Sequence, residues 1–493
     1  MRNLIFAAAS LIILSPSAAF AQSSQGDHLS VEQVMSDVDL AKDAYGRIHP
    51  GYTRYTNAAE LDAAWNDVIA DAHARNGMSQ GEFYLAIQRV LTLIRCDHTK
   101  AELSKDLRKD RNKTPVYLPL RWHLVEGRAL ISIPSKNSGL ERGDEIIAID
   151  GRPLPDLIKE VEAFIPYDGK TTWSRAGGVG ESLEFMGGAV DHFGALLWTV
   201  GPKARLDIKT PDGAFKTVTL DRVIFDTWKA LGDANARARN FKNAVSYQRI
   251  GDNTGYLKID TFVNYRDPVK PDKLFDPIFK SIKSENRDFL ILDLRENGGG
   301  SNDARIRLTA HLIKEPLKAK KEMRVATLNF DGLREHLTTW DKRALKPNPL
   351  GFKKNDDGTY ALRAFVDSDL KTIKPDKYRF DGTLIVLTSA TNSSGSTSLS
   401  ATLRSHRDAV LIGERTGGSA EGPTAGLLFT LTLPESGVRT RVPFFRSYNN
   451  VEHFQHGLGV SPDIQAPMTV AAYLAGEDPA YDAALAYIAS KQN

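Results

Sequence analysis

Residues 289–301 read FLILDLRENGGGS, and residues 384–400 read LIVLTSATNSSGSTSLS. Each stretch starts as a run of apolar residues and ends in a turn rich in glycine or serine, ahead of a predicted helix. Near-continuous apolar runs are typical of parallel strands that are buried on both faces of a sheet. With a third run over residues 409–412, they predict an α/β domain from about residue 250 onward. Residues 427–433 and 438–445, joined by a Pro-Glu-Ser-Gly turn, predict a hairpin in the same domain.

Two regions of different character precede this domain. Residues 28–95 predict helices, because Ser79 and Glu82 form a capping-box pattern ahead of an apolar stripe at helical spacing. Residues 115–222 carry short β-type runs separated by Gly, Pro and Asp. We therefore expect a mixed multidomain α/β protein. Its predicted parts are an N-terminal helical region over 22–112, a β-rich domain over 113–222, the α/β domain over 223–475, and a C-terminal helix or tail over 476–493.

Composition narrows the function by exclusion. The chain has 493 residues, with 64 Lys and Arg against 61 Asp and Glu, so its formal charge of +3 gives no general attraction to nucleic acid. The single cysteine, Cys96, rules out an internal disulfide and cysteine-rich zinc or iron–sulfur sites. We expect no cofactor, and composition leaves the oligomeric state open.

The first residues have the pattern of a secretory signal peptide. Arg2 precedes an apolar run from Leu4 to Leu14, and Ala19-Phe20-Ala21 offers small residues where a signal peptidase cleaves. The run is shorter than the roughly 20 apolar residues of a membrane-spanning helix. We therefore expect cleavage after Ala21, no stable membrane span, and a periplasmic or secreted protein.

The two turns that follow the apolar strands are candidate sites for chemistry. Consecutive glycines at 298–300 permit positive φ and let backbone N–H groups converge on a negatively charged oxygen. This turn lacks the Lys-Ser/Thr of a phosphate-binding P-loop. The serines at 393–398 have two interpretations, a helix N-cap or a nucleophile. They do not form the Gly-x-Ser-x-Gly elbow of the α/β-hydrolases.

A family resemblance favours the nucleophile. Residues 293–300 and 393–403, followed by LIGERTGG at 411–418 and GLGVSPDI at 457–464, resemble the tail-specific, C-terminal-processing serine peptidases. The resemblance is greater to the branch of the tricorn core and the retinoid-binding repeats. It extends back to IRCDHT at 94–99, similar to the family's Asp-Gly-His-Thr motif, and SGLERGDEIIAIDG at 138–151 resembles a PDZ-domain signature. The resemblance implies a crotonase/ClpP-like αββ catalytic domain, with Ser394 as nucleophile and the backbone amides of Gly299 (or Gly300) and Gly395 as an oxyanion hole.

The same resemblance points to a histidine base. The processing-protease branch uses a lysine about 25 residues after the serine, but that position falls near Ser419, and no lysine occurs between Lys377 and Lys491. The tricorn-like branch uses a histidine from the helical region, and His98 occupies that place. Imidazole, with a pKa near 6.5, can accept the serine proton and return it to the leaving amine. Cys96 is expected to be a buried small residue.

The group that orients His98 is less clearly marked. Tricorn-like enzymes use a glutamate just before the Gly-Val-x-Pro-Asp segment. Strict spacing from Val460 falls on His456, whereas a glutamate occurs four residues earlier, at Glu452. We take Glu452 as the candidate, with Asp97 or another group as the alternative. His453 and His456 are spaced like a metal pair, without an evident third ligand.

These patterns together predict an exported serine peptidase. Its substrate would be a peptide or unfolded protein, presented as an extended segment or C-terminus by the PDZ-like domain. A catalytically silent member that binds peptides or apolar ligands in the same cleft is the alternative, which the displaced glutamate favours. A hydrolase for a non-peptide ester or amide is a third interpretation, because the catalytic groups do not select the acyl group.

Overall fold

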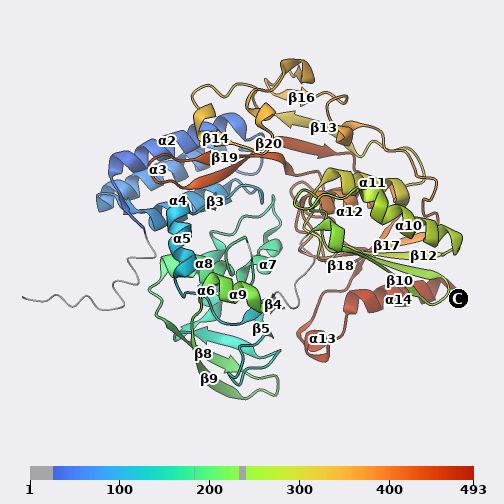
Figure 1. Ribbon diagram of the computed structural model, residues 1–493, viewed down its shortest axis with the longest axis horizontal. Helices are drawn as coiled ribbons and strands as arrows, with labels where there is room; N and C mark the ends of the chain where they lie inside the picture. Colours follow the sequence, from blue (N-terminus) through green and yellow to red (C-terminus); the bar gives the residue numbers. More distant parts are fainter. Residues whose placement is uncertain (1–25, 183, 233–239, 493) are drawn as a thin grey trace, which may run out of the picture.

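The computed structural model describes residues 26–182, 184–232 and 240–492. The predicted signal peptide and its cleavage point lie outside these residues. Figure 1 shows three parts: N-terminal helices, a β-rich domain beneath them, and a larger α/β domain at the side. The predicted mixed helix and sheet architecture is confirmed. Within the described residues, no helix has both the length and the apolar character needed to cross a membrane.

A six-stranded sheet forms the centre of the α/β domain. All its strand pairs are parallel except β10 with β11. In spatial order the strands are β10 (Val245–Ile250), β11 (Thr254–Ile259), β12 (Phe289–Asp293), β17 (Thr383–Thr388), β18 (Val410–Gly413) and β21 (Ile464–Gln465). Every residue of β12 is buried, as its unbroken apolar run predicts.

Helices cover both faces of this sheet, which explains why its central strands are apolar on both sides. One face packs against α10 (Pro271–Ser284), α11 (Asn302–Leu312) and α12 (Ser394–Arg407). The other packs against α14 (Pro479–Gln492), through Ala484 and Ile488. The turns after β12 and β17 therefore meet at one edge of the sheet, because neighbouring parallel strands end on the same side.

The predicted hairpin is confirmed as β19 (Thr424–Thr432) and β20 (Arg439–Asn449). It belongs to a second sheet with β13 (Lys320–Val325), β14 (Leu337–Thr338), β15 (Phe352–Lys354) and β16 (Tyr360–Leu362). The hairpin extends from the α/β domain across to the N-terminal helices (Figure 1). There β20 pairs with β3 (Ala101–Glu102), so the segment that carries His98 is attached to the α/β domain by main-chain pairing.

The N-terminal region is helical, as predicted. Its helices are α2 (Val31–Ile48), α3 (Ala58–Arg75), α4 (Gln80–Leu93) and α5 (Lys105–Lys113), with short strands β1 (His28–Leu29) and β2 (Met78–Ser79). The capping box at the start of α4 forms as expected: the Glu82 N–H donates to Ser79 Oγ at 3.2 Å, and the Ser79 N–H donates to Glu82 Oε2 at 2.8 Å. This helix ends at Leu93 and releases the chain into the segment of Asp97 and His98.

The β-rich domain is built on a six-stranded antiparallel sheet. Its strands, in spatial order, are β4 (Arg121–Val125), β5 (Arg128–Ile133), β6 (Glu145–Ile149), β8 (Lys203–Lys209) and β9 (Phe215–Asp221), and β7 (Arg152–Pro153) pairs with β6. The helices are α6 (Leu154–Glu162), α7 (Ala176–Val179), α8 (Ala189–Leu197) and α9 (Phe225–Leu231). Helix α13 (Val470–Ala475) returns from the α/β domain and packs Val470 and Tyr473 against Val125 and Leu130.

Candidate active site

Ser394 lies at the first position of α12, directly after the turn that follows β17. Its φ of +49° is left-handed, a conformation that non-glycine residues rarely adopt. Asn392 fixes the turn, because its side-chain amide donates to the carbonyls of Leu294 at 2.5 Å and Asn297 at 3.0 Å. Among the described residues none hydrogen-bonds to the Ser394 hydroxyl, which is half-buried. The turn therefore presents Ser394 in a constrained backbone with its hydroxyl available.

The glycine turn after β12 lies against this serine. A Cβ on Gly299 would be only 2.9 Å from Ser394 Cβ and 3.0 Å from the Gly395 nitrogen. Gly299 and Gly300 have φ of +105° and +137°, so both positions require glycine. The two apolar strands of the sequence thus bring their turns together, as the prediction required.

The structure favours Gly300 over Gly299 as an oxyanion donor. The Gly299 N–H already donates to the Asn297 side-chain oxygen at 2.8 Å. Gly300 forms a parallel bridge with Phe262. In this bridge the Phe262 N–H donates to the Gly299 carbonyl, and the Ser301 N–H donates to the Phe262 carbonyl. The Gly300 N–H takes no part in the bridge. The second candidate donor, the Gly395 N–H, lies in the first turn of α12, where backbone amides have no helical acceptor.

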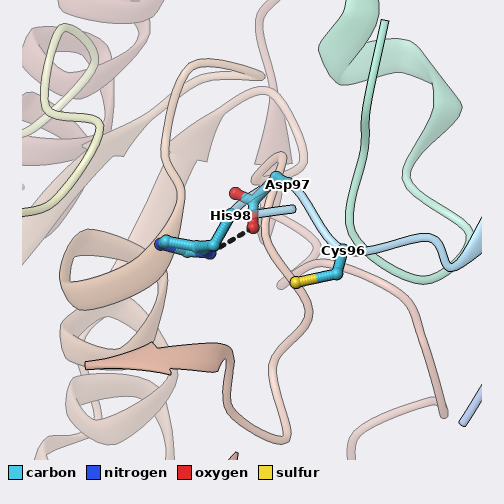
Figure 2. A group of neighbouring side chains, drawn as sticks. All are labelled: Cys96, Asp97 and His98. Atoms are coloured by element: carbon cyan, nitrogen blue, oxygen red, sulfur yellow. Dashed lines mark ion pairs between the residues drawn. The ribbon is translucent and has the colours of Figure 1, made fainter. Parts of the chain in front are cut away.

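His98 and Asp97 lie against the serine turn, although nearly 300 residues separate them from it in sequence. His98 Nδ1 is 2.6 Å from Asp97 Oδ1, and the Ser393 hydroxyl donates to Asp97 Oδ2. Figure 2 shows the His98 imidazole beside the Asp97 carboxylate, with a dashed line between the two groups. Asp97 therefore links the histidine to the residue before Ser394.

Each member of the pair shifts the pKa of the other. Burial alone would lower the pKa of His98, but the Asp97 carboxylate raises it well above its ordinary value. Burial would raise the pKa of Asp97, but the charge of His98 and the hydrogen bonds from His98 and Ser393 hold it well below its usual range. Asp97 therefore favours the protonated form of His98, and the proton on His98 keeps Asp97 ionised.

The structure does not bring Glu452 to His98. The Glu452 side chain is exposed, and its backbone N–H donates to Ser405 Oγ at 3.2 Å near the end of α12. Of the two groups considered for orienting His98, Asp97 makes the contact. Spacing along the chain could not show this, because the loop before Gly457 turns Glu452 outward.

His456 reaches a different carboxylate. Its Nδ1 lies 3.1 Å from Glu421 Oε1, and the same glutamate pairs with Arg54 at 2.8 Å. Glu421 also accepts from Tyr55 Oη at 3.0 Å and from the Gly457 N–H at 2.9 Å. Sequence reasoning did not find Glu421. Its position could have indicated it, because Glu421 is two residues from Ser419, the place where the processing-protease branch has its lysine.

One group of three candidate metal ligands occurs in the described parts of the chain. The ligating atoms of Cys96, Asp97 and His98 all lie within 4.8 Å of one another (Figure 2). Each donor already has a partner: the Cys96 thiol, which is buried, donates to the Thr424 carbonyl at 3.3 Å, and the other two pair with each other. This arrangement fits proton transfer better than metal binding. The other metal candidates differ: His456 pairs with Glu421, and the His453 side chain is exposed.

Two protein-family models match the sequence. Residues 253–466 match the model of peptidase family S41, and residues 114–228 match that of a PDZ domain. No curated protein matches the sequence at a significant level.

Solved structures share the fold at low sequence identity. Mature CPAF complexed with lactacystin is 17% identical with a TM-score of 0.63, and the match covers 93% of this chain and 97% of that chain. Mature CPAF alone is also 17% identical with a TM-score of 0.61, covering 90% of this chain and 94% of that chain. The photosystem II D1 C-terminal processing protease is 15% identical with a TM-score of 0.43, and the match covers 89% of this chain and 93% of that chain.

Proposed function

We propose that this chain is a serine peptidase of the family S41 type with a PDZ domain, in which Ser394 is the nucleophile and His98 the general base. The observation that carries this proposal is the convergence of three distant segments. The Asp97–His98 pair is bonded to Ser393, and the glycine turn touches Ser394 and Gly395. Hydrolysis needs a nucleophile, a base and oxyanion donors within reach of one carbonyl group.

In the proposed reaction, Ser394 Oγ attacks the carbonyl carbon of the scissile bond. His98 takes the hydroxyl proton through Nε2, because Nδ1 faces Asp97, and returns it to the leaving amine. Asp97 keeps the ring oriented and stabilises the imidazolium that forms. Water then hydrolyses the acyl-enzyme by the same route in reverse, with His98 again as the base.

The oxyanion that forms needs hydrogen-bond donors. The N–H groups of Gly300 and Gly395 are the proposed pair, because both lie beside Ser394 without an assigned backbone acceptor. Loss of one such donor costs about 3 kcal/mol of transition-state stabilisation in hydrolases. The positive end of the α12 dipole lies at the same place and favours the negative oxygen.

Peptides or unfolded proteins are the proposed substrates, and the PDZ domain would present them. Such domains bind an extended peptide by adding it as a strand to a sheet edge. Here β4 and β9 form the two edges of the PDZ sheet. We also propose that the protein is exported to the periplasm or secreted, on the signal-peptide pattern of residues 1–21.

Labelling with a fluorophosphonate probe tests the catalytic assignment. We expect wild type to be labelled and to cleave fluorescein-labelled casein, and we expect Ser394→Ala and His98→Ala to lose at least about a thousandfold in both. Ser405→Ala is the matched control, because it removes a hydroxyl near the other end of α12, where the contact is with the Glu452 N–H, and it should retain labelling. Labelling that persists in Ser394→Ala and vanishes in Ser393→Ala would show that the nucleophile is Ser393.

A further inference from the structure

One connection of the PDZ domain enters the α/β domain. It joins α6 to α7, and its residue Asp168 is only 2% exposed. The Asp168 carboxylate accepts two hydrogen bonds from Ser419, from the backbone N–H at 2.9 Å and from the hydroxyl at 2.5 Å. Both bonds cross from the PDZ domain to the peptidase domain, over a sequence separation of 251 residues.

Ser419 ends a turn that lies directly against the nucleophile. The N–H groups of Gly417 and Gly418 both donate to the Asn392 carbonyl, at 2.8 Å and 2.9 Å. A Cβ on Gly418 would be 3.1 Å from Ser393 Cα and 3.2 Å from the Ser394 nitrogen. The turn over 417–419 is therefore packed against the backbone whose left-handed conformation presents Ser394, and Asp168 holds the far end of that turn.

The neighbours of Asp168 make further main-chain bonds to the active site. The Gly169 N–H donates to the Arg95 carbonyl at 2.9 Å, two residues before Asp97. The Lys170 N–H donates to the Gly457 carbonyl at 2.7 Å. This short connection thus contacts the histidine segment, the serine-supporting turn and the loop of Gly457.

The surroundings of Asp168 are unusual for a carboxylate with a purely structural role. Burial, followed by the charge of Asp97, raises the pKa of Asp168 to about 6. Arg54 opposes this shift, and Ser419 donates to the carboxylate. Tyr55 and Glu421 complete the group, since Tyr55 Oη lies 3.4 Å from Ser419 Oγ and 3.0 Å from Glu421 Oε1. A buried acid beside another acid is destabilising unless its hydrogen bonds compensate. The two hydrogen bonds that Asp168 accepts both come from Ser419, in the 417–419 turn.

We propose that Asp168 of the PDZ domain is a positioning residue of the peptidase, which holds the 417–419 turn and through it the backbone of Ser393 and Ser394. This inference rests on the proposed function of Ser394. It assigns to the PDZ domain a part in the geometry of the catalytic site, separate from substrate presentation. Misplacement of a reacting group by about 1 Å can reduce the rate a hundredfold.

Fluorophosphonate labelling kinetics separate positioning from binding, because kinact reports the reaction of the bound probe and KI reports its binding. We expect Asp168→Ala to lower kinact by about a hundredfold with KI changed less than about threefold. Asp168→Asn keeps an oxygen acceptor for the Ser419 N–H and should recover kinact to within about tenfold of wild type. Ser419→Ala removes the hydroxyl contacts with Asp168 and Tyr55 but keeps the backbone bond to Asp168, so it should lower kinact by about tenfold, less than Asp168→Ala does.

Asp144→Asn is the matched control. Asp144 is also a buried PDZ carboxylate that accepts a backbone N–H, from Glu141 at 3.0 Å, but its ion pair is with Lys216 inside the PDZ domain. We expect this variant to label at the wild-type rate even where it lowers the Tm as much as Asp168→Asn does. If kinact falls in proportion to Tm in both Asp144→Asn and Asp168→Asn, the effect on kinact reflects stability alone, and the inference is overturned.

The outcomes also separate this inference from the proposed function. Wild-type kinact in folded Asp168→Ala and Ser419→Ala, with wild type active, would overturn the positioning role and leave Ser394 as the nucleophile. If Asp168→Ala fails to fold, the Ser419→Ala result decides the inference alone. If wild type neither labels nor cleaves casein, the proposed function fails and the positioning role fails with it.

Discussion

Asp97 is the residue whose role changes most between sequence and structure. Sequence spacing left two groups to orient His98, and only the Asp97 carboxylate lies against the ring. A carboxylate in the adjacent residue can reach Nδ1 only if the backbone turns both side chains the same way. The left-handed φ of +57° at Arg95 begins that turn. Such a conformation in a non-glycine residue leaves no mark in a sequence.

The Asp97–His98 pair predicts how activity depends on pH. The Asp97 carboxylate raises the pKa of His98 well above its ordinary value, and only the neutral imidazole can act as a base. Activity should therefore increase as pH rises through that raised pKa. Lys100 and Cys96 also face the pair, and the charge of Lys100 helps to keep Asp97 ionised.

Asp97→Asn tests this relation. Removing the carboxylate lowers the pKa of His98, so the inflection of the kcat/KM profile should move to lower pH. The maximal rate should fall by about a thousandfold or more, because the amide no longer selects the His98 tautomer or stabilises its charge. The measurement is the rate of casein cleavage from pH 5 to 10. An unchanged inflection would show that another group sets the pKa of the base.

At the scale of elements, local sequence signals predicted most of the secondary structure. The capping box of α4 and the apolar runs of β12, β17 and β18 were readable because each depends on residues close together in the chain. The sequence did not show which backbone N–H groups already have an acceptor. The sequence offered Gly299 or Gly300 as an oxyanion donor. The structure favours Gly300, because the Gly299 N–H donates to the Asn297 side chain, a contact that a run of glycines does not specify.

The PDZ domain gives a prediction at this scale. If its sheet edge captures the C-terminus of a substrate, a peptide with a free terminal carboxylate should be cleaved faster than the same peptide with an amidated terminus, by about tenfold or more in kcat/KM. The comparison uses two peptides of identical sequence and the full-length enzyme. Equal rates would contradict C-terminal capture and leave an extended internal segment as the bound form.

At the scale of the whole molecule, the domain order was predictable and the contacts between domains were not. Changes of composition mark the helical, β-rich and α/β regions, and the domain boundaries placed on them remain predictions. The bonds that join these regions connect residues hundreds of positions apart, such as β3 with β20 and Asp168 with Ser419. Single-sequence periodicity holds no information on such pairs. For this reason Asp168 and Glu421 did not enter the predicted site.

Export is a property of the whole chain and has a direct test. Cleavage after Ala21 would leave a mature protein of 472 residues that begins at Gln22, as 21 residues are removed from 493. We expect intact-mass and N-terminal analysis of the protein expressed in a bacterium to find that species in the periplasmic fraction. Full-length protein confined to the cytoplasm would contradict export.

The central claim is that Ser394 carries the acyl group during hydrolysis. The most direct measurement is mass-spectrometric mapping of the fluorophosphonate adduct on the wild-type protein after proteolytic digestion. The account predicts one stoichiometric adduct, located on Ser394 and absent from His98→Ala. An adduct on Ser393 or on any other residue, or no adduct under conditions that label a control serine hydrolase, would contradict it.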